Sequence, residues 1–127
     1  VTPTITPTPV DGMKVTLNLP DDTIRAGHSF YLDIIIDNLN AQFQHGIPLF
    51  CILEAAETFW YYPTWTTDPA WETLDYITTG QTTVTIFEPF PWPDNAGQGT
   101  ARFYGVLSNP EMSRILGEYD VREFGWE

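Results

Sequence analysis

Apolar and polar side chains alternate along much of this chain, and this alternation restricts the folds that the chain can adopt. In residues 13–19, "MKVTLNL", every odd-numbered residue is apolar and every even-numbered residue is polar. Residues 30–38, "FYLDIIIDN", carry a similar pattern. Successive side chains of a β-strand point to opposite faces, so a repeat of two residues is typical of strands that bury one face. Both segments are therefore predicted to be β-strands.

Further segments have the composition of strands and are separated by turn residues. They are residues 47–56, 59–63, 81–90, 100–109 and 118–126. Glycine and proline punctuate the chain between them, and only residues 110–116 leave room for a helical turn. A succession of short strands without helical periodicity indicates an antiparallel β-sandwich. The expected fold class is therefore all-β.

The first residues, "VTPTITPTP", alternate threonine with proline. Proline fixes its own φ and restricts the residue before it to extended conformations, so we expect an extended arm without a packed core. The chain is accordingly divided into an N-terminal arm, residues 1–12, and a sandwich domain, residues 13–127. Thr/Pro tracts are typical of extracellular linkers and of O-glycosylation. An unmodified spacer is the alternative to the candidate acceptors Thr2, Thr4, Thr6 and Thr8.

A family resemblance follows from the succession of motifs "AGHSFYLDIIIDN", "IPLFCILE", "FWYYPTW", "TTGQTTVTIFEPFPWP" and "ILGEYDVREFGW". Together they resemble an immunoglobulin-like module that follows Thr/Pro linkers in large secreted or surface proteins of bacteria. The resemblance covers residues 13–127 and implies an antiparallel immunoglobulin-like β-sandwich of about seven to eight strands. It also implies an extracellular structural or binding role, and it supplies no catalytic residues.

The charge balance excludes some partners. The chain has 17 Asp and Glu residues against 5 Lys and Arg residues, a net charge of −12. Nucleic acid and anionic membrane surfaces repel such a chain. No segment has the roughly 20 apolar residues that cross a bilayer, so membrane insertion is not expected. Cys51, the single cysteine, lies in an apolar run and is interpreted as a core residue.

The stretch "FWYYPTW", residues 59–65, is the densest group of aromatic residues. In a strand, Phe59 and Tyr61 point opposite to Trp60 and Tyr62, so one core cannot bury all of them. Three interpretations stay open: a cluster covered by the chain's own loop, a contact with another subunit, and stacking on sugar rings. The candidate residues for a ligand or partner are Trp60, Tyr62, Trp65, Trp71, Tyr76 and Trp92.

Signals for catalysis are weak. Carboxylates surround the aromatic block, namely Glu54, Glu57, Asp68, Glu72 and Asp75, but a chain this acidic places some there by chance. His28 and His45 lie in predicted turns, and no zinc-ligand spacing or nucleophile elbow exists in the sequence. We therefore expect no enzyme. Asp37, Asp94 and Asn95 offer oxygen ligands for calcium, with Asx turns as the simpler explanation and no other cofactor expected.

These patterns together predict a non-catalytic extracellular or cell-surface module with a structural or adhesive role. Self-assembly into a filament or surface layer through the N-terminal arm is the more specific hypothesis, with copies of the chain or other extracellular domains as partners. The assembly residues are Thr2, Pro3, Thr4, Ile5, Thr6 and Pro7. The alternative is a carbohydrate-binding module that a Thr/Pro linker tethers to an enzyme.

Overall fold

The computed structural model describes residues 12–127 and is built from β-strands and their connections. The strands are β1 (Met13–Asn18), β2 (Thr23–Ile24), β3 (Ser29–Asn38), β4 (Ile47–Ala55), β5 (Thr58–Tyr61), β6 (Glu72–Leu74), β7 (Gly80–Pro91), β8 (Gly99–Leu107) and β9 (Asp120–Trp126). The predicted all-β fold class is confirmed. No helical turn forms in residues 110–116, where Met112 has a φ of +56° that interrupts a right-handed turn.

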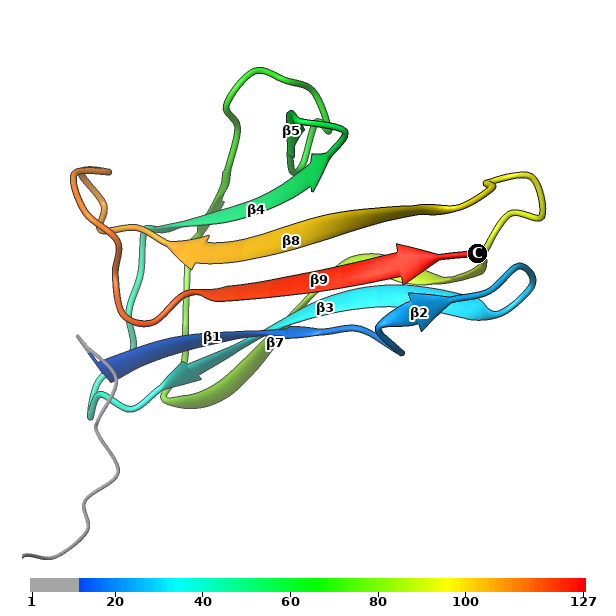
Figure 1. The fold of residues 1–127 in the computed structure, drawn as a ribbon. Coiled ribbons are helices and arrows are strands. Elements are labelled where there is room, and N and C mark those ends of the chain that lie inside the picture. Colours follow the sequence, from blue (N-terminus) through cyan, green and yellow to red (C-terminus); the bar gives the residue numbers. More distant parts are fainter. Residues whose placement is uncertain (1–11) are drawn as a thin grey trace, which may run out of the picture.

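Two sheets face each other across the core (Figure 1). The smaller sheet has the order β1-β3-β7, and the larger has the order β2-β9-β8-β4-β5 with β6 paired to β4. Neighbouring strands are antiparallel except β2, which runs parallel to β9. This arrangement is an immunoglobulin-like β-sandwich, as predicted.

The core is filled by the apolar half of the alternating pattern. In β1 and β3 the inward residues are nearly inaccessible to solvent, because these residues share one face of the smaller sheet. The larger sheet contributes its own alternate residues, including Leu49, Cys51, Phe103 and Phe124. The rings of Phe103 and Phe124 stack with centroids 5.2 Å apart. The core therefore lies between the sheets, as the period of two predicted.

Two short strands were not expected from the sequence. β2 has 2 residues and β6 has 3, which is too few for an alternation to be recognised. Each is defined by its partner in the fold, β2 by β9 and β6 by β4.

The outer side of β1 is closed by the chain that leads into β9. Val15 N donates to Glu118 O over 2.9 Å, and Glu118 N donates to Met13 O over 3.0 Å. Leu17 N donates to the Oδ2 of Asp120 over 2.8 Å. The two sheets are therefore joined along this side of the sandwich.

Predictions for the first 11 residues lie outside the described residues. They concern the extended arm, its O-glycosylation at Thr2, Thr4, Thr6 and Thr8, and the assembly residues Thr2, Pro3, Thr4, Ile5, Thr6 and Pro7. In the part of the chain that is described, no helix has the length and apolar character to cross a bilayer.

Candidate functional site

The outer face of the larger sheet carries a row of apolar and aromatic side chains. The register of β9, β8, β4 and β5 aligns, in that order, Val121, Tyr104, Ile52 and Tyr61. Phe59 lies beside this row with 45% of its surface exposed and its ring centroid 6.4 Å from that of Tyr104. Ile52, Phe59, Tyr61 and Tyr104 line a shallow hollow of about 340 Å³. We call this set the outer aromatic face.

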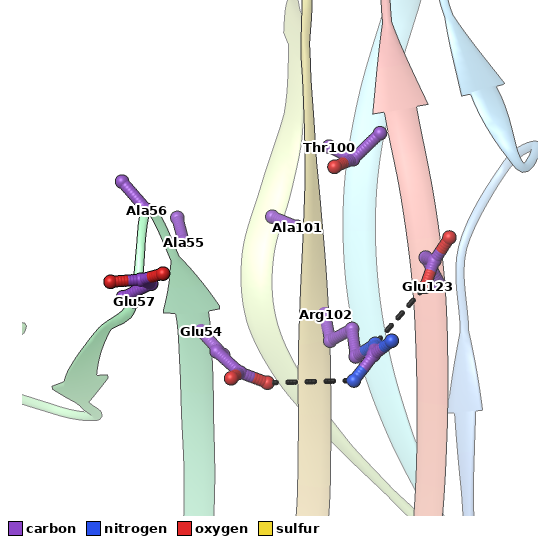
Figure 2. Close-up of a pocket in the computed structure, with 8 residues that line it drawn as sticks. All are labelled: Glu54, Ala55, Ala56, Glu57, Thr100, Ala101, Arg102 and Glu123. Atoms are coloured by element: carbon purple, nitrogen blue, oxygen red, sulfur yellow. Dashed lines mark hydrogen bonds and ion pairs between the residues drawn. The ribbon is translucent and has the colours of Figure 1, made fainter.

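A row of charged side chains borders the outer aromatic face (Figure 2). Arg102 Nε donates to Glu123 Oε2 over 3.0 Å, and the Nη1 of Arg102 lies 3.9 Å from Glu54 Oε1. Tyr104 donates its hydroxyl proton to Glu54 Oε1 over 2.6 Å, and this bond raises the pKa of Tyr104. The hydrogen bond to Glu123 likewise raises the pKa of Arg102. Glu54, Arg102 and Glu123 line a second hollow, of about 230 Å³, at the turn that carries Ala56 and Glu57. Figure 2 shows the side chains of these residues.

The two rows together combine flat ring surfaces with fixed hydrogen-bonding groups. Aromatic faces stack on the apolar faces of sugar rings, and carboxylate and guanidinium groups bind hydroxyls. The surface is open and shallow, which suits binding better than enclosed chemistry.

Three of the predicted aromatic residues pack against the chain's own core. Trp65 stacks on Phe87 with ring centroids 5.2 Å apart, and Trp92 lies 5.2 Å from Phe30. Tyr62 donates its hydroxyl to Glu72 over 2.9 Å, and burial with this hydrogen bond raises its pKa to about 12. These rings stabilise the sandwich.

The other three predicted aromatic residues are exposed, but on separate parts of the surface. Trp60 lies on the side of β5 opposite to Phe59, paired with Leu53. Trp71 packs 5.6 Å from Phe50, two residues before Ile52 in β4, so it extends the outer aromatic face. Tyr76 stacks on Phe43 at 4.4 Å in a different hollow. The structure thus divides the predicted set and gathers instead Ile52, Phe59, Tyr61 and Tyr104, which sequence reasoning did not select.

A second candidate is the open side of β7. β7 has 12 residues and pairs with β3, and no described strand pairs with its other side. Residues 81–87, "QTTVTIF", contain no charge and no proline, the usual protections of an edge strand. By contrast, the outer side of β1 is closed at Glu118, and β5 is only 4 residues long with Tyr61 N bonded to Thr66 O. β7 is therefore the long open edge of the described domain.

The remaining candidates do not form a site among the described residues. Asp37 accepts a hydrogen bond from Gln81 at the end of β3, whereas Asp94 and Asn95 follow β7, at the opposite end of the β3–β7 pair. No group of three His, Cys, Asp or Glu side chains within residues 12–127 is placed to hold a metal ion. Cys51 is fully buried, and burial raises its pKa to about 12.

Comparisons with known proteins bear on the fold. No family model matches the chain, and no curated protein sequence matches it. The CARDB domain of a Pyrococcus furiosus protein, solved with di-metal ions, is similar with a TM-score of 0.53 and 10% identity, and 97% of each chain is covered. The alkylpurine DNA glycosylase AlkC of Pseudomonas fluorescens, bound to DNA with an abasic site analogue, gives a TM-score of 0.52 at 11% identity over 91% of this chain.

A β-glucosidase from Listeria innocua in complex with glucose gives a TM-score of 0.50 at 15% identity over 90% of this chain. The chain spans 30% of the glycosylase and 16% of the β-glucosidase. At these identities the similarity shows the fold alone. The comparisons therefore support an immunoglobulin-like sandwich, a fold that carries many unrelated functions.

Proposed function

We propose that this chain is a non-catalytic structural module of the cell exterior that assembles with copies of itself through its N-terminal arm. The assembly is head to tail: the arm of one copy contacts the body of the next. A contact of this type that does not close into a ring produces a filament or a layer. Such a role requires no cofactor.

The observation that carries this proposal is the open side of β7. An unpaired strand edge binds another extended segment through backbone hydrogen bonds, and natural proteins usually protect such edges. Here the edge is long, uncharged and free of proline over residues 81–87. The same chain carries its own extended-type segment in residues 1–9. An exterior location is supported by the Thr/Pro composition of that segment.

Removal of the arm tests the proposal. The full chain and a chain without residues 1–9 are compared by light scattering over a range of concentrations. We expect species larger than one chain only when the arm is present. If the shortened chain assembles as well as the full chain, the arm is not the assembly element.

A carbohydrate-binding module is the second candidate, and the outer aromatic face favours it. Exposed rings beside a fixed Glu54–Arg102–Glu123 row resemble a neutral glycan platform, and the net charge of −12 disfavours an acidic glycan. Sedimentation with insoluble neutral polysaccharides tests this candidate. Tyr61→Ala and Phe59→Ala should release the chain, whereas Tyr76→Ala, in a different hollow, should not. Absence of retention on every polysaccharide would remove this candidate.

A further inference from the structure

We propose that residues 2–8 of one copy form an added strand along the open side of β7 in another copy. The added strand bonds through the peptide groups of its threonines only. This inference rests on the proposed function and specifies the docking surface, the occupant and the pattern of hydrogen bonds.

The register of the smaller sheet identifies which β7 peptide groups face the open side. Val15 N donates to Glu118 on the side of β1 away from β3, and Val15 is aligned with Ile36 of β3. In antiparallel pairs the N–H and C=O of one residue point to the same side and alternate along the strand. Ile36 therefore turns its peptide groups toward β7, where it is aligned with Thr82. Thr82 is thus committed to β3, and Thr83 faces the open side.

The same alternation places the peptide groups of Gln81 and Thr85 on the open side with those of Thr83, because the register is regular from Asp33 to Asn38 of β3. Within residues 81–86 the exposed residues are therefore also the ones with free peptide groups. An added strand meets the side chains of Gln81, Thr83 and Thr85 on the outer surface.

The N-terminal arm has a pattern that fits this edge. Its prolines, Pro3, Pro7 and Pro9, all occupy odd positions, so on one side of an extended arm Ile5 is the only residue of 2–8 that keeps an N–H donor. The even positions Thr2, Thr4, Thr6 and Thr8 keep every N–H and C=O on the other side. Proline is accepted in an edge strand when its nitrogen faces solvent. The arm is therefore suited to pair on one side and to end the sheet on the other.

The side chains of the two segments also match. Directly opposed residues share a face, so the arm threonines lie beside Thr83 and Thr85 on the outer face. Pro3, Ile5 and Pro7 then lie on the inner face, in line with Val84 and Ile86, which are only partly buried in the single domain. The added strand thereby lengthens the apolar inner face of the smaller sheet.

The larger sheet has a strand that the smaller sheet does not cover. From the side where β1 adjoins β9, the larger sheet continues through β8 and β4 to β5, whereas the smaller ends at β7. On the core-facing side of β5, Trp60 is aligned with Leu53 and remains 37% exposed. A strand added beside β7 extends the smaller sheet toward the β5 side, where Trp60 is exposed. This uncovered ring is a second observation in favour of an added strand.

The geometry favours the β7 edge of a second copy over the chain's own. The arm enters β1 at Met13, which is aligned through Asn38 with Gly80 at the start of β7. Crossing three strand spacings takes about 14 Å, or about four residues, so residues 9–12, with one of the three prolines, would be taken up by the path to the chain's own β7. The loops on either side of Gln44 and Ile77, bonded to each other over 2.9 Å and 2.7 Å, stand at this end of the sheet. A second copy can be reached by the whole arm.

Matched proline substitutions in the full chain test whether the arm forms hydrogen bonds on one side only. Association is measured by sedimentation velocity over a concentration series. Ile5→Pro adds a proline on the side that makes no bonds and should leave the association constant within about twofold of the unmodified chain. Thr4→Pro, one residue earlier, removes a bonding N–H and should weaken association about tenfold or more. Equal association constants for these two variants would overturn the one-sided ladder.

Thr83→Pro tests the docking surface. This substitution removes an N–H from the open side, so the domain should fold with a nearly unchanged unfolding transition and should lose assembly. If Thr83→Pro assembles normally, or if it fails to fold, the assignment of this edge is wrong. If all the proline variants assemble and the chain without residues 1–9 does not, the strand-addition proposal is wrong, but assembly through the arm is still supported. A full chain that stays monomeric throughout contradicts both.

Discussion

The indole ring of Trp65 lies against the ring of Phe87, with centroids 5.2 Å apart and planes 12° apart. Trp65 follows β5 of the larger sheet, and Phe87 belongs to β7 of the smaller sheet. The stack therefore joins the edges of the two sheets. Trp65 forms this contact with a φ of +53°, a value that is uncommon for residues other than glycine. The most conspicuous aromatic stretch of the sequence thus has one part that holds the sandwich together and another that faces water.

The two tryptophans of this region should respond differently to truncation. Trp65→Ala removes a ring that also contacts Phe103, and we expect the free energy of unfolding to fall by about 3 kcal/mol. Trp71→Ala removes a ring that is 39% exposed on the outer surface and should cost less than about 1 kcal/mol. Urea unfolding measures both. Similar losses for the two variants would contradict the packing described for Trp65.

Stability should fall at alkaline pH. Burial raises the pKa of Cys51 to about 12, and burial with the Glu72 hydrogen bond raises that of Tyr62 to about 12. In the unfolded chain the pKa values of the cysteine and tyrosine side chains are about 8.5 and 10. Because the folded-state pKa values are the higher ones, this stabilisation is complete below about pH 8.5 and is lost as the pH rises toward 12. Tyr62→Phe should flatten the decline, as measured by unfolding from pH 8 to 11. An equal slope in that variant would exclude Tyr62 as a contributor.

Gly117 is expected to be required for closing the outer side of β1. Its φ is +76°, and an added Cβ would collide with Met13 O. Gly117→Ala should lower the free energy of unfolding by about 3 kcal/mol, from strain and displacement of β1. Gly27→Ala is the matched control, since its φ of +80° meets open space and should cost about 1 kcal/mol. Thermal unfolding compares the two variants. Equal decreases in their unfolding temperatures would argue against a requirement for Gly117 in closing the outer side of β1.

Asn38 should be the most costly buried polar residue to remove. It is 1% exposed, and its Nδ2 donates to the carbonyls of Gln42, Ile77 and Thr78 over 3.2–3.4 Å. Asn38→Ala leaves those carbonyls without this donor, and we expect a loss of about 2–3 kcal/mol. Gln81→Ala, which breaks an exposed bond to Asp37, should cost less than about 0.5 kcal/mol. Chemical denaturation measures the free energy of unfolding of both variants. A loss for Gln81→Ala as large as that for Asn38→Ala would contradict the role given to Asn38.

Local alternation predicted the strands well because burial of one face imposes a period of two on each. β2 and β6 were not predicted, since 2 and 3 residues carry no period and depend on their partners for pairing. The opposed directions of Phe59 and Trp60 were predicted. Which of the two faces outward depends on the pairing of β5 with Leu53 and Glu54 in β4, a register that no local pattern contains.

The open side of β7 likewise depends on strand order, which the sequence does not specify. The segment "QTTVTIF" has the same appearance in a central strand as at an edge. The order β1-β3-β7 places this segment at the edge of its sheet, so one of its sides has no partner strand among the described residues.

Amide hydrogen exchange of the full chain at low and high concentration tests whether the arm adds to β7 of another copy. If the arm adds to β7 of another copy, amides of residues 81–85 that face the open side exchange more slowly at high concentration. The chain without residues 1–9 then shows no such dependence. Exchange at these amides that is fast and independent of concentration in the full chain would show that no strand is added at β7.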